Sequence, residues 1–135
     1  MTALLDEAAL VALAENLGRT LAPGEVVWLS GELGAGKTTF VNAMIRGLGA
    51  QSRATSPTYA LVHHYETPGG PVYHVDCYRV RKPEEAYDLD WETLGSGALL
   101  VIEWPERAGH WAPRPTRHIT LAHTPNPAVR RVEIA

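Results

Sequence analysis

The eight residues Gly31–Thr38 constrain this chain more than any other stretch. They read Gly-Glu-Leu-Gly-Ala-Gly-Lys-Thr and match the pattern G-x-x-x-x-G-K-S/T, in which a glycine-rich loop wraps around a phosphate. Glycines allow backbone angles that a side chain would forbid, so the N–H groups of the loop can point inward at an anion. We therefore predict a nucleoside triphosphate site, in which Lys37 reaches the β- and γ-phosphates and Thr38 offers its hydroxyl to Mg²⁺.

The residues on either side of this loop favour that interpretation. A short apolar run, Glu25–Ser30, precedes the loop and predicts a buried strand. A helix is predicted over Thr38–Leu48, where apolar residues recur at three and four positions, and its positive end would add to the field of the loop. The alternative is a glycine-rich turn with an unrelated lysine, and the strand–loop–helix order argues against it.

Composition limits the classes of protein to consider. The 135 residues, 45% of them hydrophobic, are enough for one core, so we expect a single P-loop ATPase domain over 1–135. The formal charge is −3 and the ten arginines are scattered, so the sequence shows no basic patch. Direct binding to nucleic acid is therefore not predicted. No run of about 18 apolar residues and no signal-like amino terminus is present, which predicts no membrane association. Cys77 is the single cysteine, which fits a reducing cytoplasm, and we expect it to be a small buried residue.

The remaining elements are predicted from hydrophobic periodicity and turn residues. The pattern indicates a helix over 4–17, strands over 58–65 and 72–78 joined by a turn at 68–71, a short helix over 83–87, a buried strand over 98–103, a loop or short helix over 105–115, and paired strands over 117–123 and 130–135. This order predicts an α/β fold with a mixed parallel and antiparallel sheet flanked by helices.

Two acidic residues stand at strand positions that are otherwise apolar. Asp76 ends the strand predicted over 72–78, and Glu103 ends the continuous apolar run Ala98–Ile102. One of them is expected to ligate Mg²⁺ and the other to orient the attacking water, and the sequence leaves open which does which. The alternative for each is an exposed strand acid. Arg79 could stabilise charge on the transferred phosphate or could be an ordinary surface residue.

Three further features bear on the ligand. The polar segment Ala50–Pro57, with the hydroxyls of Thr55, Ser56 and the following Thr58, is either a nucleotide-sensing segment or a connecting loop. His63, His64 and His74 could meet across a hairpin, but their spacing matches no zinc site, so no transition metal is predicted. An N-K-x-D guanine reader is absent, because the three asparagines are followed by Leu17, Ala43 and Pro127, and ATP is therefore expected.

Four motifs together resemble one family. In chain order they are Gly31–Phe40, Thr55-Ser56-Pro57-Thr58-Tyr59, His74-Val75-Asp76-Cys77-Tyr78-Arg79 and Glu103-Trp104-Pro105-Glu106. This combination resembles TsaE (also called YjeE), a family of small bacterial ATPases of tRNA threonylcarbamoyladenosine biosynthesis. The resemblance covers roughly residues 25–110. Cys77 stands where the family usually has leucine, and the last 25 residues carry no family signature.

The resemblance implies a function and a set of site residues. It implies weak ATP hydrolysis and docking on the TsaD–TsaB pair, which transfers a threonylcarbamoyl group to adenosine 37 of tRNAs that read ANN codons. It implies catalytic roles for Lys37, Asp76 and Glu103, and Mg²⁺ ligands among Thr38, Asp76 and Glu103. It places the nucleotide against Glu32, Leu33, Gly34, Ala35, Gly36, Lys37, Thr38, Thr39, Thr58 and Trp104.

Two other functions remain open from the sequence. The chain could be an ATP-gated binding module in which hydrolysis is incidental, or a minimal kinase for a small molecule. A kinase would need a lid and an acceptor pocket, for which a chain of this length leaves little room. We expect an ATPase that its partners stimulate, because no arginine finger is evident in the sequence.

Overall fold

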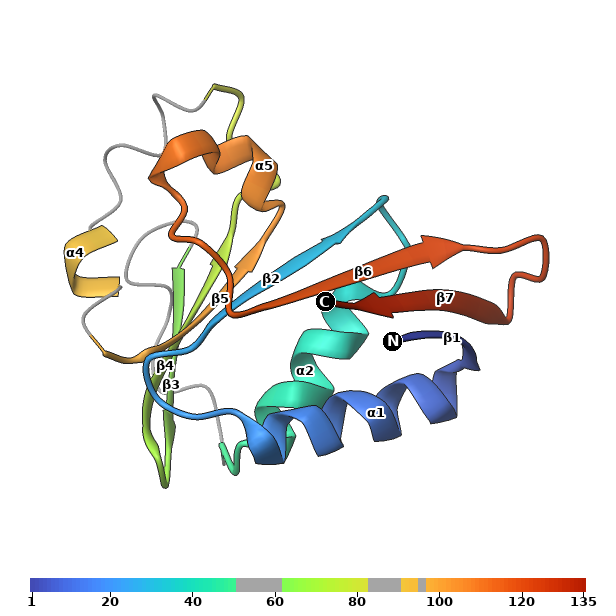
Figure 1. The fold of residues 1–135 in the computed structure, drawn as a ribbon, viewed down its shortest axis with the longest axis horizontal. Helices are drawn as coiled ribbons and strands as arrows, with labels where there is room; N and C mark the ends of the chain where they lie inside the picture. The colour runs from blue at the N-terminus through green and yellow to red at the C-terminus, as the bar shows by residue number, and fades with distance from the viewer. Residues whose placement is uncertain (51–61, 83–90, 95–96) are drawn as a thin grey trace.

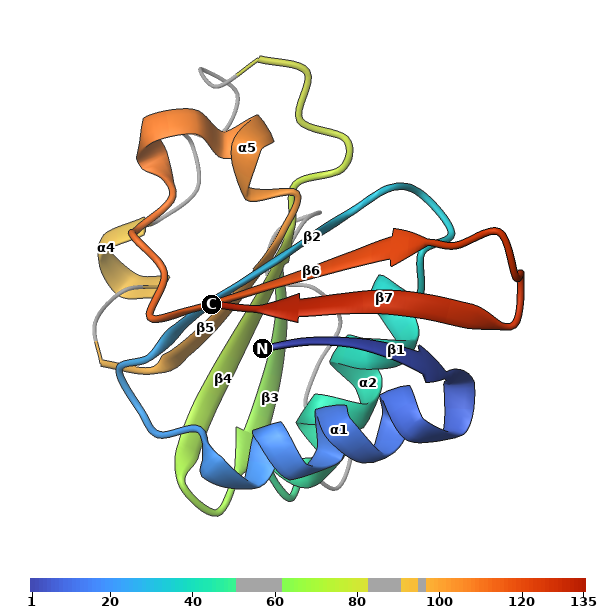
Figure 2. The ribbon, with the colours of Figure 1, turned by 45° about the vertical axis from the view of Figure 1, so that its right-hand side comes forward.

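The computed structural model of the chain describes residues 1–50, 62–82, 91–94 and 97–135, with only the backbone described at Thr93. Seven strands form one sheet in the order β1-β7-β6-β2-β5-β4-β3 (Figures 1 and 2). The strands are β1 Thr2–Asp6, β2 Val26–Gly31, β3 Val62–Thr67, β4 Gly70–Asp76, β5 Leu99–Glu103, β6 Arg117–His123 and β7 Val129–Ile134. The helices are α1 Glu7–Thr20, α2 Lys37–Gly47, α4 Trp91–Leu94, α5 Pro105–Ala108 and the 3₁₀ helix η1 Gly109–Trp111.

The centre of the sheet is parallel and its margins are antiparallel. Strands β6, β2, β5 and β4 run in the same direction, while β3, β7 and β1 pair antiparallel to their neighbours. The carboxyl ends of β2, β4 and β5 therefore lie along one edge, where Glu103 is in register with both Leu29 and Asp76. The predicted mixed α/β sheet is confirmed.

Helices cover both faces of this sheet. Helices α1 and α2 lie together on one face, and α4, α5 and η1 lie on the other (Figure 1). The first face buries Phe40, Met44, Leu29, Val101 and Leu121, and the second buries Val75, Cys77, Leu100 and Ile102. Every residue of β5 is buried because both of its faces are covered, which is the reason its sequence is a continuous apolar run.

Helices α1 and α2 approach each other closely through two glycines. A Cβ atom added to Gly18 would lie 2.1 Å from the carbonyl oxygen of Met44, and one added to Gly47 would lie 2.1 Å from that of Glu15. The two backbones thus touch where no larger residue fits. This contact holds α2, and with it the loop at its amino end, against α1.

The predicted helix over 4–17 is wrong at both ends. Residues 4–6 belong to β1, in which Leu4 and Leu5 pair with Arg131 and Arg130 of β7. The helix begins after Asp6, whose carboxylate accepts a hydrogen bond of 2.8 Å from the N–H of Ala9 and so caps α1. It then continues to Thr20, three residues beyond the predicted end.

The other predicted elements differ in smaller ways. The strand expected over 58–65 is seen as β3 from Val62, and positions 58–61 lie outside the described residues, as does the helix expected over 83–87. The strand expected over 72–78 is β4, which begins and ends two residues earlier. The segment 105–115 contains the short helices α5 and η1.

Candidate nucleotide-binding site

The loop between β2 and α2 has the backbone geometry that a phosphate cradle requires. Gly34 and Gly36 have φ angles of 78° and 102°, in the left-handed region that favours glycine. A Cβ at Gly31 would lie 2.4 Å from the carbonyl oxygen of Leu121, so β6 packs directly against the start of the loop. The N-cap residue of α2 is Gly36, which has no side chain with which to cap the first N–H groups of the helix, and a helix start of this kind suits an anion. The predicted strand–loop–helix context is confirmed.

Lys37 lies buried beneath this loop, with a relative exposure of 6%. Its Nζ donates hydrogen bonds to the carbonyl oxygens of Gly31 and Glu32, the latter at 2.9 Å, and lies 4.3 Å from the centroid of the Trp104 ring. Burial lowers the pKa of Lys37, while the negative charges of Glu103, Asp76 and Glu106 act in the opposite direction. The ammonium is therefore held by loop carbonyls, a ring and nearby carboxylates.

A cavity of about 330 Å³ opens beside Lys37 at the carboxyl ends of the strands. Its lining consists of Leu33, Gly34, Gly36, Lys37, Thr38, Thr39, Asp76, Tyr78, Glu103 and Trp104. All three residues expected to be catalytic thus meet in one cavity with most of those expected to touch the nucleotide. Glu32 and Ala35 are not in that lining, and the Ala35 N–H donates to the Glu32 carbonyl within the loop at 3.0 Å. Thr55, Ser56 and Thr58 lie outside the described residues.

The oxygen atoms around this cavity suit a hard cation. The Thr38 hydroxyl and the carboxylates of Asp76 and Glu103 are the donor types that Mg²⁺ prefers. Oδ1 of Asp76 accepts a 3.0 Å hydrogen bond from the N–H of Tyr78, and Glu103 is buried. Within residues 1–50, 62–82, 91–94 and 97–135, no three His, Cys, Asp or Glu side chains are placed to hold a metal. A Mg²⁺ ion here would need phosphate and water oxygens to complete its shell.

Trp104 joins β5 to α5 with an unusual backbone. Its φ of 55° places a bulky residue in the left-handed region, a feature that concentrates at functional sites. The Arg107 guanidinium lies 4.8 Å from the Trp104 ring centroid and 5.0 Å from that of Tyr78, and it donates a hydrogen bond to the Tyr78 carbonyl. These residues form a stack of rings and cation at the side of the cavity.

Several residues in or beside the site were not predicted from the sequence to belong to it. Nε2 of His74 lies 2.6 Å from Oε2 of Glu103, a contact that depends on the alignment of β4 with β5. His123 and Arg130, in the part of the chain without a family signature, contact the carbonyls of Leu33 and Gly34 at 3.2 and 3.4 Å. His74 and Asp76 are two positions apart in a predicted strand and so share one of its faces, which was a usable signal for the contact of His74 with Glu103. Nothing local indicated the others.

A second cavity, of about 500 Å³, adjoins the first across the loop. It shares Gly34, Gly36 and Thr39 with the first cavity and extends to the start of α1 and the β6–β7 turn. Its remaining lining consists of Asp6, Glu7, Ala8, Leu10, Pro127, Ala128 and Arg130. A ligand seated at the loop therefore has space on both sides of it.

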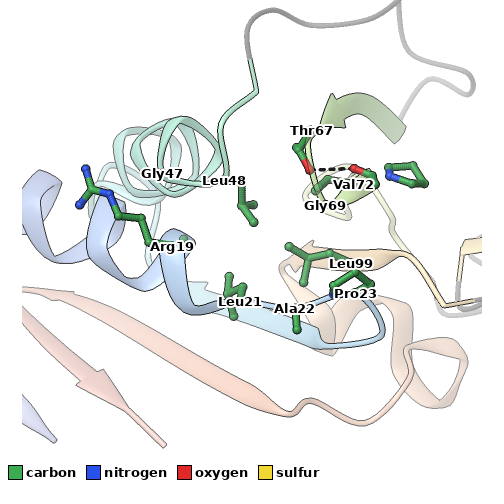
Figure 3. Close-up of a pocket in the computed structure, with 13 residues that line it drawn as sticks. Arg19, Leu21, Ala22, Pro23, Gly47, Leu48, Thr67, Gly69, Val72 and Leu99 are labelled. Carbon is green, nitrogen blue, oxygen red and sulfur yellow. Dashed lines mark hydrogen bonds between the residues drawn. The ribbon is translucent and has the colours of Figure 1, made fainter.

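A third cavity, of about 170 Å³, lies at the opposite end of the sheet from the first. Figure 3 shows the residues that line it. Arg19, Leu21 and Leu48 line it where α1 and α2 end, together with the β3–β4 turn, in which the Thr67 hydroxyl donates to the Gly70 carbonyl at 2.8 Å. Helix carboxyl ends present carbonyl oxygens and a partial negative charge, which disfavours phosphate. This cavity contains none of the predicted site residues.

The chain is similar in sequence to proteins of one known family. The sequence model of the family described as "Threonylcarbamoyl adenosine biosynthesis protein TsaE" matches residues 4–132. A relative from Rickettsia felis with the name "tRNA threonylcarbamoyladenosine biosynthesis protein TsaE" is 39% identical over 110 residues, which are 81% of this chain and 64% of that protein. One of the same name from Aquifex aeolicus is 45% identical over 97 residues, 70% of this chain and 68% of that protein. The chain thus spans less than two thirds of the Rickettsia felis relative.

The fold also has a counterpart among solved structures. The crystal structure of YdiB from Bacillus subtilis superposes with a TM-score of 0.74 and 25% sequence identity, covering 98% of this chain and 82% of that one. The described helices include none that is both long and apolar enough to cross a membrane.

Proposed function

This chain belongs to the TsaE family of tRNA threonylcarbamoyladenosine biosynthesis proteins. From that premise we propose that it is an ATPase that acts with the TsaB–TsaD pair and drives the transfer of the threonylcarbamoyl group to adenosine 37 of tRNA. The family resemblance drawn from its motifs is thereby confirmed. We propose that residues 1–135 form one P-loop ATPase domain. The final substrate would be tRNAs that read ANN codons. The protein would act in the cytoplasm, where a tRNA-modifying activity would be used.

The observation that carries the proposal is the convergence of four side chains on one cavity. Lys37 and Thr38 come from the loop, Asp76 from the end of β4 and Glu103 from the end of β5. A cation, a hydroxyl and two carboxylates beside a glycine-rich loop are the parts that phosphoryl transfer to water requires. Ligands of parallel α/β sheets bind at this edge.

Each residue has a role that its position supports. Lys37 would exchange its bonds to the Gly31 and Glu32 carbonyls for phosphate oxygens, and Thr38 would ligate Mg²⁺. Bound Mg²⁺ would neutralise charge on the phosphates. Asp76 and Glu103 would divide metal ligation and the positioning of water between them. Trp104 would cover the phosphates from the side on which its ring now covers Lys37.

The nucleoside would occupy the second cavity. That cavity begins at Gly34, Gly36 and Thr39 and combines apolar side chains with the polar groups of Asp6 and Arg130, which suits a flat base and a ribose. The β- and γ-phosphates would then lie in the first cavity, beside Lys37 and the two acids.

The need for a partner follows from the charges around the cavity. Its described lining contains Lys37 and no arginine, and the nearby Arg107 is stacked on Trp104 and Tyr78. Phosphoryl transfer accelerates strongly when an arginine stabilises the transition state. We expect the TsaB–TsaD pair to raise the rate of hydrolysis, either by supplying such a group or by ordering the site.

The test is phosphate release from ATP, with and without TsaB–TsaD, for the native chain and three variants. Lys37→Ala and Glu103→Ala should abolish the stimulated rate, whereas Lys82→Ala, which removes the chain's other lysine, an exposed one, should leave it intact. Equal release with and without the pair would contradict partner stimulation. If Glu103→Ala loses hydrolysis but still supports tRNA modification over many turnovers, the chain is an ATP-gated binding module instead.

A further inference from the structure

We infer that His74 is a positioning residue for Glu103, holding one carboxylate oxygen so that the other faces the phosphate cavity. This inference rests on the proposed ATPase function, because it assigns a role within the same site. His74 is not itself among the residues that line the cavity, so it would act through Glu103, which is.

The contact is direct and enclosed. Nε2 of His74 lies 2.6 Å from Oε2 of Glu103, and the two side chains are 11% and 6% exposed. Strands β4 and β5 are parallel neighbours, with Asp76 in register with Glu103 and His74 two residues earlier. His74, Asp76 and Glu103 thus project from the same face of the sheet, the one that α2 covers.

The chemistry of the pair fixes the direction of the hydrogen bond. An ionised carboxylate can only accept, so the Nε2 atom of His74 must carry the proton and donate it. Such a bond is short and strong when solvent is excluded. With Oε2 engaged, Oε1 is the carboxylate oxygen left for Mg²⁺ or for water.

The surroundings of the ring support a positioning role. The described part of the chain places no hydrogen-bond partner at Nδ1 of His74, so Glu103 is the polar contact that orients the imidazole. His63 is the cross-strand partner of His74 on β3, and the two rings lie with centroids 5.7 Å apart at an interplanar angle of 30°. The His74 ring is thus contacted by the His63 ring and hydrogen-bonded to Glu103.

The first test measures the ring nitrogens in the full chain without nucleotide. Long-range ¹H–¹⁵N correlation spectra of the imidazole should show His74 with a proton on Nε2, and Glu103→Ala should shift its signals. A His74 ring protonated on Nδ1 alone would overturn the inference, because Nε2 could not then donate. This readout needs neither ATP nor a partner.

The second test separates positioning from a general structural effect. With TsaB–TsaD present, His74→Leu should lower kcat about 10- to 100-fold, with the KM for ATP changed less than about twofold. His74→Gln, which can donate from a nearby position, should restore most of kcat.

The matched control is His64→Leu. His64 is a half-buried histidine on β3 that pairs with the exposed Glu66 at 2.8 Å, away from the cavity, so its loss should leave kcat unchanged. Unchanged kcat in His74→Leu, or an equal loss of kcat in His64→Leu, would overturn the inference. If His74→Leu fails to fold by circular dichroism, His74→Gln and the nitrogen spectra decide.

A native chain without stimulated hydrolysis would contradict the proposed function, and the spectra would still decide whether His74 contacts Glu103.

Discussion

Lys37 and Glu103 are two charged residues that the fold buries almost completely. Their relative exposures are 6% and 5%, a degree of burial that charged side chains rarely show without partners. Glu103 is bonded to His74, and Lys37 to two loop carbonyls, so neither charge is left without compensation. Buried opposite charges in one cavity favour binding of a ligand that carries both a metal and phosphates.

Cys77, one residue beyond β4, is a buried side chain that stays uncharged. Burial, reinforced by the charges of Asp76, Glu106 and Glu103, raises the pKa of its thiol to about 12, so it remains protonated and unreactive. We expect a thiol reagent at pH 8 to label the folded chain at least about tenfold more slowly than the chain in denaturant. Equal rates would show that Cys77 is accessible in the folded state.

The same pKa shift predicts how stability changes in alkali. Below the ordinary thiol pKa of 9.0 the thiol is protonated in both states, so Cys77 adds no pH dependence there. Between 9.0 and about 12 the unfolded chain releases the proton and the folded chain keeps it, so the free energy of unfolding falls as pH rises. Urea titrations should show this extra fall in the native chain and not in Cys77→Ala. Parallel pH curves for the two proteins would contradict the shift.

At the level of elements, the position of the nucleotide loop depends on how α2 packs on α1. The two helices touch backbone to backbone at Gly18 and Gly47, so their separation is set by the absence of side chains. Helix α2 begins at Lys37, and any displacement of the helix therefore moves the phosphate-binding residues. The stability of this helix pair and the geometry of the site are linked.

Alanine at either glycine should destabilise the fold. Gly18→Ala and Gly47→Ala would each force a Cβ into a carbonyl oxygen 2.1 Å away, and we expect a loss of about 1–3 kcal/mol or more in the free energy of unfolding. Gly69→Ala is the control, because its Cβ would meet only the Thr67 hydroxyl at 3.9 Å. Urea denaturation measures all three. Similar midpoints for Gly18→Ala and Gly69→Ala would show that the helices can separate without cost.

At the level of the whole molecule, the site depends on residues distant in the chain. Strands β2, β4 and β5 deliver the loop, Asp76 and Glu103 to one edge, while β6 and β7 place His123 and Arg130 against the loop. The chain ends also meet, since the Met1 amino group donates to the Ile134 carbonyl at 3.0 Å (Figure 2). A ligand in the site would bridge elements from most of the described chain.

Binding should therefore stabilise the molecule globally. MgATP at a hundredfold excess over its Kd should raise the free energy of unfolding by about 2.7 kcal/mol and shift the Tm upward by several degrees. Lys37→Ala should lose this shift and Lys82→Ala should keep it. Calorimetry with and without Mg²⁺ would check the expectation, and an equal shift in Lys37→Ala would place the nucleotide elsewhere.

Much of the fold could be predicted from local patterns. The strand–loop–helix unit around Lys37, the buried strand ending in Glu103 and the final pair of strands were each confirmed, because hydrophobic period and turn residues act over a few positions. Residues 4–6 were wrongly assigned to a helix. Their strand conformation depends on pairing with β7, more than a hundred residues away, which no local pattern reports.

The sequence by itself determined the glycine-rich loop, the apolar faces and the acids at strand ends, because these follow from backbone freedom and from the alternation of side chains. Only the tertiary structure decided which of these residues meet. The register of β4 against β5 sets Asp76 beside Glu103 and brings His74 to its carboxylate, and the hairpin of β6 and β7 brings Arg130 to the loop. Register depends on packing summed over the whole sheet, so these contacts exist only once the sheet is assembled.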